Sequence, residues 1–269
     1  MNQNPPPLRF ARARLRTGLH MHYAEQGDPA GHAILFLHGY SDSWYSFSRL
    51  LPLLAPSYHA FAVSERGHGD SDKPECCYSL DDFASDVDAF MDAVGIAGAT
   101  IVGHSGGGII AQRVAVKYPH RVRGLVLIST AAKGTLFRGI SELEEAVRTL
   151  EDPVPDAFAR EFQQSTIYGS VPEEFFETVV SECLKVPSRV WRDYFDGVVL
   201  AETDQLPQIK APTLILWGDR DSYPPREEQD RLAREIPNAT LRVYTETGHD
   251  PHWERPEDVV RDLDIFLQQ

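Results

Sequence analysis

Apolar residues follow two alternating patterns along this chain of 269 residues. Short, nearly continuous apolar runs predict buried strands, and longer segments with apolar residues at every third or fourth position predict helices. The predicted strands cover residues 33–37, 59–63, 100–102, 122–128, 213–217 and 240–244, after an opening hairpin at 8–16 and 20–26. The predicted helices cover residues 44–54, 79–94, 109–118, 226–236 and 256–267. This alternation favours an α/β fold, with a mostly parallel sheet and helices on both faces.

The stretch from residue 134 to residue 206 breaks the alternation. It is acidic, prone to form helices and rich in aromatic residues, and it contains no good central strand. We interpret it as a helical insertion between two strands, so that residues 1–133 and 207–269 form the core. Most of its aromatic side chains are expected to pack within the insertion, and a minority to face a ligand. These aromatic residues are Phe137, Phe158, Phe162, Tyr168, Phe175, Phe176, Trp191, Tyr194 and Phe195.

The sequence Gly103-His104-Ser105-Gly106-Gly107 lies between a predicted strand and a predicted helix. A strand, a G-x-S-x-G turn and a helix in this order are typical of a nucleophile elbow. The turn leaves no room for side chains beside the serine, which explains glycine at 103 and 107. It also lifts the Ser105 hydroxyl above the sheet edge, at a helix N-terminus that favours anions. The pattern alone is weak, because about one chain in ten of this length would contain it by chance.

A serine nucleophile needs a base beside it, and the base needs a carboxylate that orients it. In this arrangement the order along the chain is serine, acid, histidine. His249 follows the predicted strand 240–244, at the end of a strand where α/β sheets place their sites. We therefore predict that His249 is the base. His252, three residues further on, is its main rival and is also consistent with a packing role.

The acid is expected after the predicted strand 213–217. Asp221 lies four residues beyond Trp217, in a loop with room to reach the histidine, and is the preferred candidate. Asp219 directly follows a glycine and is expected to cap the turn by local hydrogen bonds. Asp250 is too close in sequence to His249 to orient its ring easily.

An oxyanion hole requires two backbone donors that point at the developing negative charge. The N–H of Gly106, after the nucleophile, is the first. The N–H of Tyr40, in the loop His38-Gly39-Tyr40 after the first central strand, is the second. Gly39 is predicted to let the backbone approach the substrate closely, although it could also be an ordinary turn glycine.

Over residues 20–268 the sequence resembles the α/β-hydrolase superfamily, in its lid-bearing branch of small serine esterases and lactonases. The resemblance rests on five motifs in the family's order: His38-Gly39, Arg66-Gly67-His68-Gly69-Asp70-Ser71, the elbow, Trp217-Gly218-Asp219-Arg220-Asp221 and Gly248-His249. It implies an eight-stranded sheet and makes the insertion 134–206 a cap over the site. It implies a carboxylesterase or lactonase that works through an acyl-enzyme intermediate on a small-molecule substrate, with no cofactor and no metal.

Two positions depart from the family pattern. The family commonly has an aspartate two residues before the arginine of the Arg-Gly-His-Gly loop, where this chain has Ser64 followed by Glu65. We expect little effect on chemistry, because that loop is mainly structural. The residue after the nucleophile is often methionine or another residue with a side chain, and here it is Gly106. This glycine is expected to widen the space near the oxyanion hole and to admit a bulkier acyl group.

The net charge and the cysteine content limit the classes of partner and the cellular location that we expect. The formal net charge is −14, which disfavours nucleic acid. No apolar stretch approaches the roughly 20 residues of a membrane span. Neighbouring Cys76 and Cys77 match neither a disulfide framework nor a zinc spacing, so a reducing, cytoplasmic location is the default. The oligomeric state, monomer or homodimer, is left open.

Other functions of this fold remain as alternatives. Ser105 argues against haloalkane dehalogenases and epoxide hydrolases, which have an aspartate at the nucleophile position. A hydrolase of carbon–carbon bonds in vinylogous diketones would need polar groups for a dicarboxylate-like substrate, and only Arg189 and Arg192 in the insertion suggest them. A ligand receptor that retains the triad is a third possibility. Trp191 and Tyr223 are candidate pocket residues, although packing is the simpler role for each.

Overall fold

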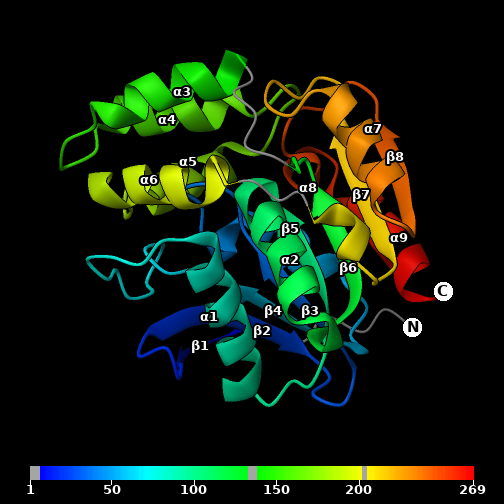
Figure 1. The fold of residues 1–269 in the computed structure, drawn as a ribbon. Coiled ribbons are helices and arrows are strands. Elements are labelled where there is room, and N and C mark those ends of the chain that lie inside the picture. Colours follow the sequence, from blue (N-terminus) through cyan, green and yellow to red (C-terminus); the bar gives the residue numbers. More distant parts are fainter. Residues whose placement is uncertain (1–6, 133–137, 202–204) are drawn as a thin grey trace.

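A single eight-stranded sheet forms the centre of the computed structural model, which describes residues 7–132, 138–201 and 205–269 (Figure 1). The sheet agrees with the predicted α/β fold. The strands are β1 (Arg9–Arg14), β2 (His20–Gly27), β3 (His32–Leu37), β4 (Tyr58–Val63), β5 (Ala99–His104), β6 (Val122–Ile128), β7 (Thr213–Gly218) and β8 (Ala239–Tyr244).

The strand order, β1-β2-β4-β3-β5-β6-β7-β8, sets the position of the site. Strand β2 is antiparallel to β1 and β4, and each strand from β4 onward in this order is parallel to the next. The chain leaves β3 for β4 on one side and returns to β5 on the other. The loops after β3 and β5 therefore diverge at the carboxyl ends of two adjacent strands, which is where open α/β sheets bind ligands.

Helices cover both faces of the sheet (Figure 1). Alternate residues of the central strands belong to different clusters. Leu35 and Leu37 pack with the helices of one face, and Ile34 and Phe36 pack with those of the other. Strands buried on both faces explain the continuous apolar runs in the sequence. The first face carries α1 (Leu80–Ala93), α2 (Ser105–Lys117) and α7 (Arg226–Glu235), and the second carries α9 (Pro256–Leu267), which follows the short α8 (Pro251–Glu254).

In the described residues between β6 and β7, four α-helices form a separate group beside the sheet (Figure 1). They are α3 (Arg138–Arg148), α4 (Asp156–Ser165), α5 (Glu173–Cys183) and α6 (Ser188–Tyr194), which continues into a π-helical turn at Phe195–Val199. We call residues 138–201 the helical insertion. The predicted boundary at 133/134 and Phe137 lie outside the described residues, and the division into core and cap stays a prediction.

The segment 44–54 differs from its predicted helix. It forms two short 3₁₀ turns, Trp44–Phe47 and Leu51–Leu53, with hydrogen bonds from residue i to residue i−3. Pro52 explains the difference, because a continuous α-helix would need its missing N–H.

Two further findings concern the cysteines and membranes. Cys76 and Cys77 are joined to each other by a disulfide bond, which was not predicted from the sequence because the two cysteines are adjacent. Cys183 is free and buried. Among the described residues, none of the helices combines the length and apolar character that crossing a bilayer requires.

Candidate active site

Ser105 occupies a strained turn between β5 and α2. Its φ is +49°, a left-handed conformation that non-glycine residues rarely adopt. A Cβ on Gly103 would lie 2.4 Å from the carbonyl oxygen of Gly107, and a Cβ on Gly107 would lie 2.3 Å from the carbonyl oxygen of His38. Both contacts are with backbone, so no side chain fits at either position. The structure thus gives Ser105 the geometry that the elbow motif predicts.

His249 and Asp221 meet at the ends of β8 and β7. His249 Nδ1 lies 2.9 Å from Asp221 Oδ1 and 3.0 Å from Oδ2, and the Asp221 side chain is fully buried. The amide of Tyr223 also donates to Asp221 Oδ1 at 2.8 Å, which fixes the carboxylate. The rival His252 is buried elsewhere, with its Nε2 3.1 Å from Ser46 Oγ.

The loops that carry this pair are tied together by their backbones. A Cβ on Gly218 would lie 2.2 Å from the carbonyl oxygens of Thr247 and Gly248, so the loop after β7 packs directly on the loop after β8. Asp219 accepts from the amide of Glu246 at 2.7 Å. Asp219 therefore bonds across to the neighbouring loop, where a local turn cap was predicted.

Glu254 is a positioning residue that the sequence did not reveal. Its carboxylate accepts from the amides of Gly248 and Gly169, at 2.9 and 2.7 Å. The amide of His249 donates to the carbonyl of Thr166, at the end of α4, at 2.8 Å. The loop that presents His249 is thus held to the helical insertion from two sides.

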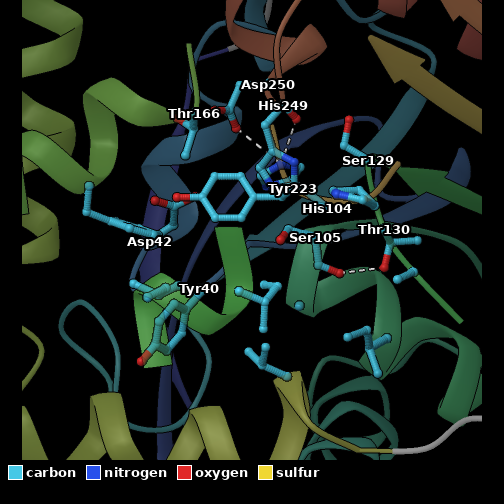
Figure 2. Close-up of a pocket in the computed structure, with 18 of the residues that line it drawn as sticks. Tyr40, Asp42, His104, Ser105, Ser129, Thr130, Thr166, Tyr223, His249 and Asp250 are labelled. Atoms are coloured by element: carbon cyan, nitrogen blue, oxygen red, sulfur yellow. Dashed lines mark hydrogen bonds and ion pairs between the residues drawn. The ribbon is translucent and has the colours of Figure 1, made fainter. Parts of the chain in front are cut away.

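The electrostatics of His249 suit a general base. Burial lowers its pKa, but the carboxylate of Asp221, with smaller contributions from Asp250 and Asp42, outweighs burial and leaves the pKa raised. No hydrogen bond joins Ser105 Oγ to His249 within the described part of the chain, although both line one cavity (Figure 2). Such contacts often tighten only when substrate binds.

The two predicted oxyanion donors flank the elbow. The amide of Gly106 lies in the first turn of α2, where N–H groups have no intrahelical partner. Among the described residues, no hydrogen bond from the Tyr40 amide is present. A Cβ on Gly39 would lie 2.6 Å from His104 Nδ1 and 3.3 Å from Ser105 Cβ. The close contact with the elbow therefore requires a glycine at position 39. Gly39 was predicted to approach the substrate, but it is not among the residues that line the cavity.

The expectation that Gly106 widens the site is wrong. A Cβ at this position would lie 2.5 Å from the hydroxyl oxygen of Tyr194, so the last residue of α6 occupies the space that the glycine leaves. Tyr194 is fully buried, and Glu65 contributes to raising its pKa, after burial. One tyrosine of the insertion thus links the departure at Gly106 with Glu65, the residue that follows the departure at Ser64.

The cavity above Ser105 has a volume of about 70 Å³, small beside the several hundred Å³ of typical ligand sites. Tyr223 lines it, as predicted. Trp191 does not: its side chain has 0% exposure and packs against Tyr40, Phe158 and Phe162. An outer groove of about 480 Å³ adjoins the cavity and shares Leu143, Phe162 and Tyr223 with it.

Two buried acids, Asp42 and Asp250, line the same cavity and were not predicted to do so (Figure 2). Asp42 lies just beyond the oxyanion loop, and Asp250 directly follows His249. Their position next to two catalytic motifs was the only feature of the sequence that could have indicated a role at the cavity. That position does not show which way the two side chains point.

Two buried sets in the described residues place potential metal ligands within 4.8 Å of one another, His38-Glu65-His68 and His104-Asp250-His252. Both ring nitrogens of His38 are already hydrogen-bonded, to the carbonyl of Gly39 and the amide of Glu65, which leaves the first set two ligands. In the second set, His252 Nε2 is hydrogen-bonded to Ser46. The absence of a metal or cofactor stays a prediction.

Comparison with known proteins places this geometry in a wider group. The family model described as the α/β hydrolase fold matches residues 32–256. The chain is 31% identical over 279 residues to 2-hydroxy-6-oxononadienedioate/2-hydroxy-6-oxononatrienedioate hydrolase 2 of Pseudomonas putida, with 95% of each chain covered. It is 27% identical over 263 residues to Lipase 3 of Moraxella sp. (strain TA144), covering 94% of this chain and 82% of the lipase.

Among solved structures, the enol-lactonase from Burkholderia xenovorans LB400 superposes with a TM-score of 0.85. The superposition covers 96% of this chain and 100% of the enol-lactonase, at 20% sequence identity. At that identity the likeness concerns the fold alone.

Proposed function

We propose that this chain, which belongs to the α/β-hydrolase family, is a serine hydrolase that cleaves a carboxylic ester or lactone through an acyl-enzyme intermediate. One observation carries the proposal. Ser105, held at φ +49° at the start of α2, lines the same cavity as His249, whose Nδ1 is 2.9 Å from Asp221. A strained serine and a buried histidine–carboxylate pair at one cavity are the parts that acyl transfer requires.

In the proposed reaction, Ser105 Oγ attacks the carbonyl carbon while His249 Nε2 takes the hydroxyl proton. The negative charge on the carbonyl oxygen is stabilised by the amides of Tyr40 and Gly106. His249 then gives the proton to the departing alkoxide, which leaves the acyl group on Ser105. Water repeats the sequence, with His249 as base, and releases the acid. Asp221 accepts from His249 Nδ1–H and stabilises the imidazolium.

Cleavage of a carbon–carbon bond in a dicarboxylate-like substrate is less well supported. The Pseudomonas putida relative is named for a dienedioate, which carries two carboxylates. Arg189 donates to the carbonyls of Lys73 and Pro74, and Arg192 to the carbonyl of Leu150, so both guanidinium groups are engaged away from the cavity. No lysine or arginine is among the described residues that line the cavity, whereas Asp42 and Asp250 are.

The helical insertion is proposed to act as the cap that sets substrate size. Phe162, Gln163 and Thr166, at the end of α4, line the cavity opposite the sheet loops. With about 70 Å³ between them, a short acyl group fits and a long one requires the wall to move. We therefore expect acetyl or propionyl esters to be preferred over octanoyl esters.

The decisive experiment is acylation of Ser105. The parent protein is mixed with p-nitrophenyl acetate, and both the p-nitrophenol burst and the mass of the quenched protein are recorded. We expect a covalent acetyl adduct on Ser105, and a loss of turnover on the order of 10⁴ to 10⁶ in Ser105→Ala. Ser85→Ala, on the surface helix α1, is the matched control and retains the parent rate.

Two outcomes would overturn the proposal. One is ester hydrolysis in Ser105→Ala within tenfold of the parent. The other is a parent that leaves p-nitrophenyl esters and homoserine lactones intact but bleaches the yellow colour of a dienedioate ring-cleavage product. The second result would establish the carbon–carbon hydrolase instead.

A further inference from the structure

Asp42 is a buried acid that the proposed reaction does not use. It is 5% exposed, and it lines the cavity beside Ser105 and His249. Its Oδ2 accepts from Ser46 Oγ and its Oδ1 from Gln163 Nε2, both at 3.1 Å. Both donors are neutral, so nothing in this contact set balances a charge on the carboxyl.

Asp250 is a second buried acid at the same cavity. It is 1% exposed, and among the described residues neither of its carboxylate oxygens has a hydrogen-bond partner. Its Oδ1 lies 3.2 Å from His104 Nε2, but that nitrogen bonds to the carbonyl of His249. The nearby hydroxyl of Thr166 donates to the carbonyl of Gln163. A buried carboxyl without a partner is unfavourable until a proton or a cation reaches it.

The rest of the cavity is suited to a cation. No lysine or arginine is among the described residues that line either the cavity or the outer groove, and the groove carries Glu142 and Glu161. Four aromatic residues, Tyr40, Phe162, Tyr223 and Trp253, are among those that line the cavity. Aromatic faces attract ammonium groups, most strongly where water is excluded.

We propose that this cavity selects esters that carry an alkylammonium group, and that Asp42 and Asp250 hold the ammonium beside the reacting carbonyl. The proposal rests on the serine-hydrolase function proposed above and names the substrate class for it. The outer groove carries negative charge, as the cavity does, and negative charge between solvent and the cavity raises the local concentration of cations.

Protonation of the two acids makes this selectivity depend on pH. Burial raises the pKa of Asp42 to about 7 and that of Asp250 well above its usual range. An arriving ammonium favours the charged carboxylates and displaces their protons. His249 and Tyr223 face Asp250, and His104 lies 3.2 Å from it, while Glu65, Tyr194 and the Cys183 thiol lie near Asp42. Asp221 stands beside His249.

The test compares esters that differ only in charge. Acetylthiocholine is paired with its carbon isostere 3,3-dimethylbutyl thioacetate, and p-nitrophenyl 4-(trimethylammonio)butanoate with p-nitrophenyl 5,5-dimethylhexanoate. The readout is the ratio of kcat/KM, cationic over neutral, within each pair. His249 acts on both members equally, so its titration cancels in the ratio. The variants are Asp42→Asn and Asp250→Asn, and Asp230→Asn, exposed on α7, controls for the loss of one negative charge.

We expect the ratio to fall about tenfold in Asp42→Asn or Asp250→Asn for at least one pair, and to stay at the parent value in Asp230→Asn. In the parent, the ratio should rise between pH 6 and pH 8. Tetramethylammonium should inhibit hydrolysis of the neutral ester competitively in the parent and more weakly in both cavity variants, which serves as a binding readout without cationic substrate.

A ratio that is unchanged in both cavity variants for both pairs would overturn the proposal. If a cavity variant hydrolyses both esters of a pair more slowly by the same factor, the acid affects only the reactivity of His249 and does not bind the ammonium group. A parent that hydrolyses neither the four esters nor p-nitrophenyl acetate would count against the serine-hydrolase function itself, whereas a parent that hydrolyses only p-nitrophenyl acetate would overturn the selectivity for cations alone. The two failures are therefore distinguishable.

Discussion

The loops at the strand ends and the helical insertion build the same cavity by different means. In the strand-end loops, close backbone contacts leave no room for a Cβ on Gly103, Gly107 or Gly218. In the insertion, side chains make several of the contacts: Gln163 donates to Asp42, and Ser165 meets the hydroxyl of Tyr223 at 2.8 Å, alongside the backbone contact from the Thr166 carbonyl to the His249 amide. Backbone contacts tolerate no substitution, whereas side-chain contacts can change one residue at a time.

This difference separates chemistry from selectivity. The groups proposed to react, Ser105, Asp221 and His249, lie on the strand-end loops. The groups that limit what reaches them, such as Phe162 and Tyr194, come from the insertion. We expect substitutions in the first region to abolish the reaction and those in the second to change its substrates.

After Ser105→Ala, the largest effect is expected from Asp221→Asn. An amide cannot stabilise the imidazolium of His249, so kcat should fall by about 10⁴. The matched control is Asp219→Asn, two residues away, whose contact is with the amide of Glu246 and which does not line the cavity. Steady-state kinetics on p-nitrophenyl acetate measures both variants.

A drop of similar size in Asp219→Asn would show that the loop as a whole matters, and not the carboxylate at 221. A parent-like Asp221→Asn would point to Asp250, which also raises the pKa of His249, as the acid that stabilises the imidazolium.

The same division explains how much could be predicted from the sequence. The elbow, the Trp217–Asp221 loop and His249 are short-range patterns in which glycines and strand ends restrict the backbone, and their positions could be predicted before the fold was known. The overall sheet followed from apolar periodicity for the same reason. These features depend on local geometry.

Contacts between distant segments could not be predicted. Gly106 was expected to open the site, but Tyr194, 88 residues further along, fills that space. Trp191 was expected at the cavity, but α6 turns it into the core. The burial of Asp42 depends on Gln163 of α4. No local pattern records which side chain of one helix meets which residue of a loop.

The next largest effect is a gain in stability in Asp42→Asn at high pH. The pKa of Asp42 is raised from 3.8 to about 7 in the folded protein, so the unfolded chain releases this proton at lower pH. The parent therefore loses stability as pH rises between those two values, by about 1.4 kcal/mol for each pH step of one. Urea unfolding should show Asp42→Asn a few kcal/mol more stable at pH 8 and nearly equal to the parent at pH 4.

Asp230→Asn should differ from the parent by the same small amount at both pH values, because Asp230 is exposed. If Asp42→Asn were less stable than the parent at pH 8, the carboxylate would be balanced by contacts other than Ser46 and Gln163. A stable Asp42→Asn that loses its preference for cations would indicate that the acid is kept for selectivity at the expense of stability.

A smaller effect, about tenfold, is expected in Tyr223→Ala. Tyr223 lines both the cavity and the outer groove, as Leu143 and Phe162 do. Its removal should let a longer acyl chain pass into the groove, so the kcat/KM ratio of octanoate to acetate esters rises. Tyr223→Phe keeps the ring and loses only the contact with Ser165, and it should retain the parent ratio.

The smallest effect concerns the pH profile of the parent with a neutral ester. The neutral imidazole of His249 is the base, and its pKa is raised above 6.5 because Asp221 outweighs burial. The acid limb of kcat/KM should therefore have its midpoint above pH 6.5, and activity is lost as pH falls through it. Rates between pH 5 and pH 9 measure the limb, and a midpoint below 6.5 would mean that burial prevails.

The variant Asp42→Asn tests whether the helical insertion also affects the acid limb of the pH profile. Asp42 contributes to the raised pKa of His249, and Gln163 of the insertion holds Asp42 in place. Removing that charge should move the midpoint slightly to lower pH while kcat at pH 8 stays close to the parent value. If the acid limb does not move, Asp42 acts only in substrate selection, and the pKa of His249 is set by the strand-end loops alone.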